Sequence, residues 1–281
     1  MARSKKRHKD GGTYRENASS GRLVGVKQSV RFATAYQRID WAKEHTAELK
    51  NGSDFFFRDF FEADKSVRVA ELDSHGLYTL DKIRFKQRLP EQFTRLTVQA
   101  IESLRAALDH AACAVVVGAA NKKRTAFVFG DTKRDFDASF ASKCKHVPNE
   151  IKTLFSTFKA YKRGNPPLWA LNKICNAYKH RTIIEPGVTA KDVSFVDPPT
   201  DLSVAVFRPR WNRRKNELII SKTIDKGTAH HDIDMSIGVV FGKVPFFGWK
   251  PVLAGLRYMT SIAESIVMAT EAEARRIGVI R

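Results

Sequence analysis

The chain has 281 residues, a formal net charge of +19 and an apolar share of 43%, which is ordinary for a globular protein with a real core. Its three cysteines, Cys113, Cys144 and Cys175, form no C-x-x-C pair, which argues against a disulfide framework and against a thiolate zinc site. No uninterrupted apolar run of about 18 residues occurs, and no apolar stretch follows the basic N-terminus, so neither a membrane-spanning helix nor a secretory signal is expected. We therefore expect a cytoplasmic protein with no membrane partner.

The positive charge is spread over most of the chain. Residues 1–22 contain seven Lys/Arg and two acids, so +5 of the +19 lies there and +14 lies on the rest. Residues 1–24 lack apolar periodicity and are predicted to be a disordered basic tail, with residues 25–281 as a single domain. A body this basic attracts polyanions, nucleic acid above all; charge that serves only solubility is the alternative.

Helical periodicity dominates the chain. The apolar spacing predicts helices over 26–50, 91–119, 135–142, 149–161 and 168–181, and a last helix that Trp249-Lys250-Pro251 opens and that ends near 277. Asn51-Gly52 is expected to close the first helix, and Pro90 directly precedes the second. Because the second helix is rich in alanine, we expect other helices to approach it closely in the middle of a bundle.

Alternating apolar and polar residues predict strands over 55–62, 67–72, 78–85, 193–195, 202–208, 217–223 and 236–241, with a short extended piece over 125–129. Ser74-His75-Gly76 is expected to form a turn. For the cluster that begins at Phe55-Phe56-Phe57, packing in the core of a small sheet is favoured over a base-stacking platform. The predicted fold class is α+β and mainly helical: a bundle of long helices interrupted by two antiparallel β segments near 54–87 and 190–243.

The first motif with chemical potential is Leu104-Arg105-Ala106-Ala107-Leu108-Asp109-His110, inside the second helix. Arg105 and Asp109 are i, i+4 neighbours, and His110 lies further round the same non-core side. Arginine binds phosphate and histidine moves protons near neutral pH, so the pair suits cleavage of RNA through its 2′-hydroxyl. The alternative is an Arg–Asp pair that joins two helices, with His110 held in a tight interface.

A second motif runs from Leu168 to Arg181, and its polar residues gather beside a core stripe. They are Asn172, Asn176, Lys179 and His180, with Arg181 at the end of the helix. These residues either bind a substrate or stabilise the end of the helix. The second alternative fits Lys179, His180 and Arg181 in the last turn, because cations interact favourably with the negative end of the helix dipole.

Together the two motifs resemble a widespread bacterial family of uncharacterised proteins with the pattern LRSALDH … FPI … LWxLxxLxNxDKHR. Through Arg105 and His110 the chain is also similar to the HEPN superfamily, helical domains whose hallmark is an Arg, four to six residues and a His. The resemblance implies metal-independent RNA cleavage, a homodimer and no cofactor, with Arg105 as phosphate ligand and His110 as proton-transfer residue. Ala106 stands where many active members have a polar residue.

The resulting hypothesis is an RNA-directed protein, active as a metal-independent ribonuclease. Its candidate catalytic residues are Arg105, Asp109, His110 and His180, and its candidate substrate-binding residues are Asn172, Asn176, Lys179 and Arg181. The alternative is a non-catalytic domain that binds nucleic acid or protein, in which the same residues form a structural polar network.

Two further clusters are weaker. Arg208, Arg210, Arg213, Arg214 and Lys215 surround Trp211 in a basic turn, which suits phosphate binding and base stacking or a solvated hairpin tip. His230-His231-Asp232 has no third ligand at a suitable spacing, so no metal site is expected.

Overall fold

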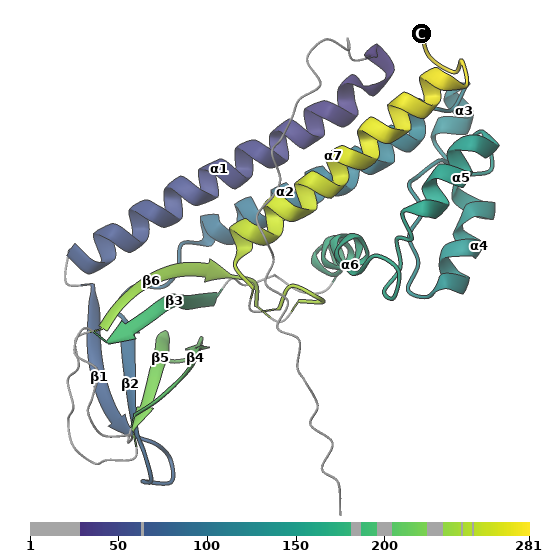
Figure 1. Cartoon of the computed structure of the whole chain (residues 1–281). Helices are drawn as coiled ribbons and strands as arrows, with labels where there is room; N and C mark the ends of the chain where they lie inside the picture. Colours follow the sequence, from purple (N-terminus) through teal and green to yellow (C-terminus); the bar gives the residue numbers. More distant parts are fainter. Residues whose placement is uncertain are drawn as a thin grey trace, which may run out of the picture.

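The computed structural model describes residues 29–62, 65–180, 187–195, 204–223, 233–242, 244–248 and 250–281, and the predicted tail lies outside them. These residues form an α+β, mainly helical fold, as predicted (Figure 1). The helices are the short η1 (Val30–Phe32), α1 (Ala33–Glu62), α2 (Glu91–Ala114), α3 (Ala119–Lys122), α4 (Lys133–Lys143), α5 (Asn149–Thr157), α6 (Pro166–His180) and α7 (Val252–Arg276). The strands are β1 (Ser66–Leu72), β2 (Thr79–Phe85), β3 (Gly187–Phe195), β4 (Val204–Asn212), β5 (Glu217–Thr223) and β6 (Ile233–Val240).

Three long helices, α1, α2 and α7, lie side by side along the molecule (Figure 1). Polar contacts join α1 to α7: Tyr36 donates a hydrogen bond to Glu271 at 2.6 Å, and Lys43 pairs with Glu264 at 2.7 Å. The inner face of α2 consists of fully buried small and apolar residues: Ala100, Ala107, Ala111, Ala112, Leu104 and Leu108. Small side chains permit close packing of neighbouring helices, and α1 and α7 both contact α2.

The phenylalanine-rich segment is helical, so the predicted strand over 55–62 and the predicted helix end at Asn51-Gly52 are both wrong. α1 continues without interruption to Glu62. Phe57 is buried, and Phe56 packs edge-on against Phe93 of α2 with ring centroids 5.8 Å apart, while Phe55 is 62% exposed. Contact with α2 therefore overrides both the β propensity of the phenylalanines and the low helix propensity of glycine.

The strands form two antiparallel sheets, one of four strands in the order β1-β2-β5-β4 and one of β3 and β6. Strands over 67–72, 78–85 and 217–223 are confirmed, and the strands predicted over 193–195, 202–208 and 236–241 are present with shifted bounds. The two β segments are not separate sheets, however, because β2 pairs with β5 and places Ile83 opposite Leu218. This pairing places the C-terminal end of β2, near residue 85, beside the N-terminal end of β5, near residue 216, although the two are far apart in the sequence.

The connections after α2 differ in length from the prediction. α2 ends at Ala114 instead of near 119, and Gly118 adopts a φ of +91° shortly after it. Residues 125–129 do not form a strand. The helix α5 ends at Thr157 instead of near residue 161. α4 and α6 confirm the helices predicted over 135–142 and 168–181, with small shifts of their ends.

Among the described residues, α7 alone has the length and apolar composition of a membrane-spanning helix. Its most apolar window is 44% buried inside the protein, and the helix packs against α1 and α2. A core helix has the same composition, so this feature is no argument for a membrane.

Candidate functional site

The two sequence motifs meet where α2 packs against α6. The Nε of Arg105 donates a hydrogen bond to the Oδ1 of Asn172 at 3.0 Å. The same guanidinium forms an ion pair with Asp109 and lies over the ring of Phe129, 4.4 Å from its centroid. The Arg105 side chain is only 13% exposed. Arg105 therefore joins α2 to α6 and to the segment that follows α2.

Asp109 extends this set of contacts to the backbone. Its Oδ1 accepts a hydrogen bond from the N–H of Phe127 at 2.9 Å, and its Oδ2 faces Arg105. Phe127 is fully buried and packs against the rings of Phe129 and Phe155. Asp109 thus fixes the extended residues 125–129 against α2. We refer to Arg105, Asp109, Asn172 and the Phe127 N–H as the α2–α6 network.

His110 lies on a different side of α2 from Arg105, because five residues turn a helix by about 140°. Its imidazole is half-buried and makes no hydrogen bond to another residue in the described ranges. Burial lowers the pKa of His110, the charge of Arg38 on α1 lowers it further, and Asp109 opposes both. Burial and Arg38 therefore both favour the neutral imidazole, and the cation that acts on it is Arg38 instead of Arg105.

Arg38 was not singled out in the sequence. Its guanidinium lies over the ring of Trp41 at 4.7 Å, and its buried Nε has no hydrogen bond to any part of the chain that the structure describes. The only local signal is an Arg–Trp pair at i, i+3, which is common on helix surfaces.

The other α6 candidates are only partly in view. Asn176 is exposed and has no hydrogen bond to a described residue, so it stands apart from Asn172. The side chains of Lys179 and His180, and all of Arg181, lie outside the described residues. Lys173, the residue after Asn172, forms an exposed ion pair with Asp131 at 2.7 Å. Among the described candidates of the second motif, Asn172 forms a hydrogen bond with the first motif.

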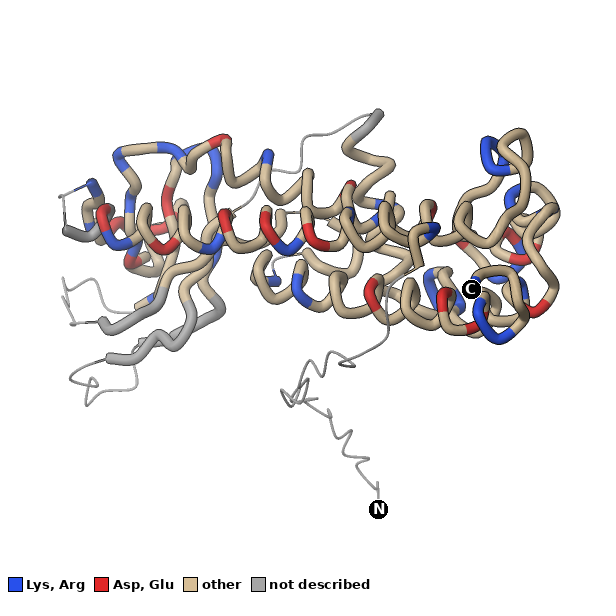
Figure 2. The backbone as a smooth tube through the Cα atoms, turned by 90° about the horizontal axis from the view of Figure 1, so that it is seen from above, with Lys and Arg blue, Asp and Glu red and all other residues tan. Residues whose placement is uncertain are grey.

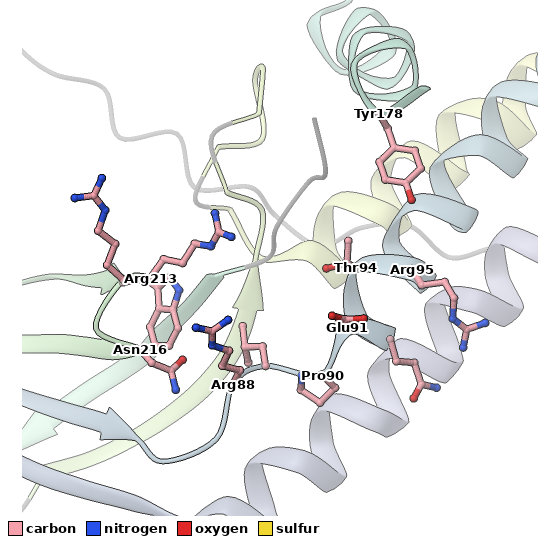
Figure 3. Close-up of a pocket in the computed structure, with 12 residues that line it drawn as sticks. Arg88, Pro90, Glu91, Thr94, Arg95, Tyr178, Arg213 and Asn216 are labelled. Carbon is pink, nitrogen blue, oxygen red and sulfur yellow. The ribbon is translucent and has the colours of Figure 1, made fainter. Parts of the chain in front are cut away.

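A cavity of about 980 Å³ lies at the junction of the sheet with the N-terminal end of α2 (Figure 3). Neither Arg105 nor His110 lines it. Its charged lining residues within the described ranges are Arg88 before α2, Glu91 and Arg95 on α2, and Arg213 and Arg214 in the β4–β5 turn. Trp211, Asn216 and Tyr178 also line it. The Arg95 side chain turns toward α1, away from Arg88 and Arg213 (Figure 3). We call this the arginine cavity.

Asn216 holds two walls of the arginine cavity together. Its Nδ2 donates hydrogen bonds to the carbonyl oxygens of Phe85 and Gln87, both at 2.7 Å, and its own carbonyl oxygen accepts from the Phe85 N–H at 2.9 Å. Its φ is +52°, a conformation that asparagine tolerates better than most residues. This clasp fixes the turn that carries Arg213 and Arg214 beside the connector that carries Arg88.

Two arginines that line the arginine cavity have no partner among the described residues. Arg88 and Arg214 form no ion pair or hydrogen bond with another described residue, and Glu91 is the one acid among the described lining residues. Elsewhere on the helices, Lys and Arg alternate with Asp and Glu (Figure 2). The cavity is therefore a site at which an anion finds unpaired guanidinium groups.

The sequence indicated only one wall of this cavity. Arg213, Arg214 and Trp211 belong to the predicted basic turn, whereas Arg88 and Arg95 are single arginines with no motif around them. Tyr178 of α6, which belongs to no predicted site, is half-buried and lines the cavity. No cluster of three or more His, Cys, Asp or Glu suited to a metal occurs in the described ranges, and His230-His231-Asp232 lies outside them.

Comparisons of the chain with family models, with curated proteins and with solved structures give no match.

Proposed function

We propose that this protein binds RNA, and that the arginine cavity holds the phosphates of the bound strand. The observation that carries the proposal is that Arg88, Arg213 and Arg214, from two segments joined by Asn216, line one cavity in which Glu91 is the one acid among the described lining residues. Guanidinium groups suit phosphate because their donors match two oxygens at once. The resemblance of Arg105 and His110 to the motif of the RNA-cleaving HEPN domains favours RNA over DNA.

In this proposal the α2–α6 network is structural. Its support is that Arg105 already has an ion pair, a hydrogen bond and a ring contact, all within a largely buried side chain. Because only 13% of the Arg105 side chain is exposed, little of its guanidinium group is accessible to a phosphate. The long helices α1, α2 and α7 then form a bundle of the HEPN kind, with the sheets as an addition that supplies the binding site.

Binding of a fluorescent RNA, measured by anisotropy, tests the proposal with two triple variants of equal charge. The test variant carries Arg88→Gln, Arg213→Gln and Arg214→Gln. The control carries Arg134→Gln, Lys145→Gln and Arg163→Gln, three exposed cations without described partners on the α4–α5 side of the molecule.

The test variant is expected to bind on the order of 100-fold more weakly, at about 1 kcal/mol for each lost contact. The plot of log affinity against log salt concentration should also become shallower by about 2, because each of the three lost single-strand phosphate contacts contributes roughly 0.7 to its slope. The control should change the affinity by less than about threefold. Equal losses in both variants would mean that general charge, and not the cavity, binds the RNA.

A second candidate function is metal-independent ribonuclease activity centred on His110. The observation that favours it is a half-buried imidazole that makes no hydrogen bond to a described residue and whose pKa is lowered by burial and by the charge of Arg38. Such a group can accept the proton of a 2′-hydroxyl. Incubation of end-labelled RNA in EDTA, with His110→Ala as test and the exposed His146→Ala as control, checks it. Cyclic-phosphate products that only His110→Ala abolishes would support catalysis, and absence of cleavage by the wild type would leave binding alone.

A further inference from the structure

Two aromatic side chains line the arginine cavity together with the arginines. Trp211 comes from the end of β4, two residues before Arg213, and Tyr178 comes from α6. The Tyr178 side chain extends from α6 toward Thr94 on the first turns of α2 (Figure 3). Both rings are half-buried, so each is supported by the protein and still contributes surface to the cavity.

Trp211 is held in place by the sheet. Its ring meets the buried ring of Phe85 edge to face, with centroids 5.2 Å apart and an interplanar angle of 89°. Trp211 also lies opposite Leu218 of β5, and Leu218 is fully buried. The Asn216 clasp fixes the backbone next to both contacts. The indole is therefore a rigid surface, and little conformational entropy is lost when a flat group stacks on it.

Phosphate binding by itself does not require aromatic rings. A polyanion without bases, or a duplex whose base faces are hidden in the stack, uses only the guanidinium groups. An unpaired nucleotide offers a phosphate and a free base face together, and aromatic side chains beside basic residues are the usual receptor for it. A cavity of about 980 Å³ lies at the upper end of the range found for ligand pockets, which is ample for one nucleotide.

Resting on the proposed function, we propose that the arginine cavity receives an unpaired nucleotide of single-stranded RNA. Its phosphate lies on Arg88, Arg213 and Arg214, and its base stacks on Trp211 with Tyr178 on the α6 side. Selectivity for single strands then comes from the two rings, and affinity for phosphate comes from the arginines.

Three probes separate these contributions: a labelled twelve-nucleotide oligouridine, the same strand in a duplex with oligoadenine, and heparin, which has anionic groups and no bases. The variants are Trp211→Leu, which removes the ring, and Trp211→Phe, which keeps a smaller one. Tyr178→Leu, on a different element, provides a second test that does not depend on how the sheet tolerates a change at 211. Thermal unfolding of every variant shows whether it is folded.

The wild type is expected to bind the single strand about tenfold more tightly than the duplex. Trp211→Leu should lose roughly tenfold for the single strand and little for duplex or heparin, because stacking on one aromatic side chain is worth about 1–3 kcal/mol per base. Trp211→Phe should retain most of the affinity. The tryptophan emission of the wild type should be quenched by oligouridine and not by heparin, and Trp211→Phe should lose that quenching.

Equal binding of single strand and duplex by the wild type, or quenching that persists unchanged in Trp211→Phe, would overturn the stacking inference. Phosphate binding would survive that result, provided that the Arg88, Arg213 and Arg214 triple variant still loses affinity for all three probes. Absence of binding to any probe by the wild type would overturn both proposals together.

Discussion

Replacement of Arg105 by methionine tests whether the α2–α6 network holds the fold together. Methionine keeps an unbranched chain of similar length in the space between α2 and α6 and removes the charge and every donor. The side chain loses its hydrogen bond to Asn172, its ion pair with Asp109 and its contact with the ring of Phe129. Asp109 keeps the hydrogen bond from the Phe127 N–H, so it is not left without a partner.

The loss of stability follows from these three contacts. A hydrogen bond to a charged group contributes about 1.5–3 kcal/mol, and a partly desolvated cation–π contact about 0.5–2 kcal/mol. The ion pair adds less, because the Asp109 side chain is 36% exposed and i, i+4 pairs contribute about 0.3–0.5 kcal/mol. Since coupled contacts are not additive, we expect a total of about 3 kcal/mol. For a chain of this size, this lowers Tm by roughly 6–12 °C.

Urea unfolding followed by circular dichroism measures this change. The matched control is Arg95→Met on the same helix, where an exposed arginine has no ion pair or hydrogen bond to a described residue and the change should stay within about 0.5 kcal/mol. An Asn172→Ala variant and the double variant complete a cycle, with an expected coupling of about 1 kcal/mol or more. If Arg105→Met is as stable as Arg95→Met, the network does not stabilise the fold and Arg105 regains its place as a candidate phosphate ligand.

Three further changes test other features. Asn216→Gly suits the positive φ but removes both Nδ2 hydrogen bonds, so RNA affinity in the anisotropy assay should fall severalfold with no change in charge; unchanged affinity would show that the clasp is dispensable. Gly130→Ala should destabilise the protein by about 1–3 kcal/mol in urea, because a Cβ there would lie 2.3 Å from the backbone nitrogen of Phe136. Burial opposes ionisation of Glu271, but hydrogen bonds from Tyr36, the Ser29 N–H and Arg275 outweigh this effect and lower the pKa of Glu271. Ionised Glu271 therefore stabilises the fold above the ordinary glutamate pKa, and this stabilisation is lost as the pH falls below that pKa. The stability difference between wild type and Glu271→Gln should therefore shrink as urea titrations move from pH 7 to pH 3, and a constant difference would contradict this assignment.

The sequence predicted elements well wherever one periodicity was unopposed. The alanine-rich stripe of α2 and the strand over 217–223 are examples. The prediction was wrong at Phe55-Phe56-Phe57, where β propensity and a nearby glycine both point away from a helix. The deciding contact there is Phe56 on Phe93, which lies on another helix and is invisible to local patterns.

The pairing of the strands could not be predicted from the sequence, for a different reason. Strand periodicity identifies which residues face one side of a sheet, but it does not name the neighbouring strand. The pairing of β2 with β5 joins segments separated by more than a hundred residues, and the arginine cavity depends on it. Arg88 and Asn216 have no motif in common, so no local pattern could have predicted that they line one cavity.

The two groups of arginines differ in a way that links folding to function. Arg105 has an acid, an amide and a ring as partners, so its charge is neutralised inside the protein and its loss should be felt as instability. Arg88 and Arg214 are exposed, with no ion pair or hydrogen bond to other described residues, so their removal should leave stability almost unchanged. An exposed guanidinium without a partner adds nothing to the fold, whereas it is available to a phosphate at little desolvation cost. The positive charges behind the net charge of +19 therefore act differently at different positions. At Arg105 the charge stabilises the fold, whereas in the arginine cavity it is available to bind an anionic ligand.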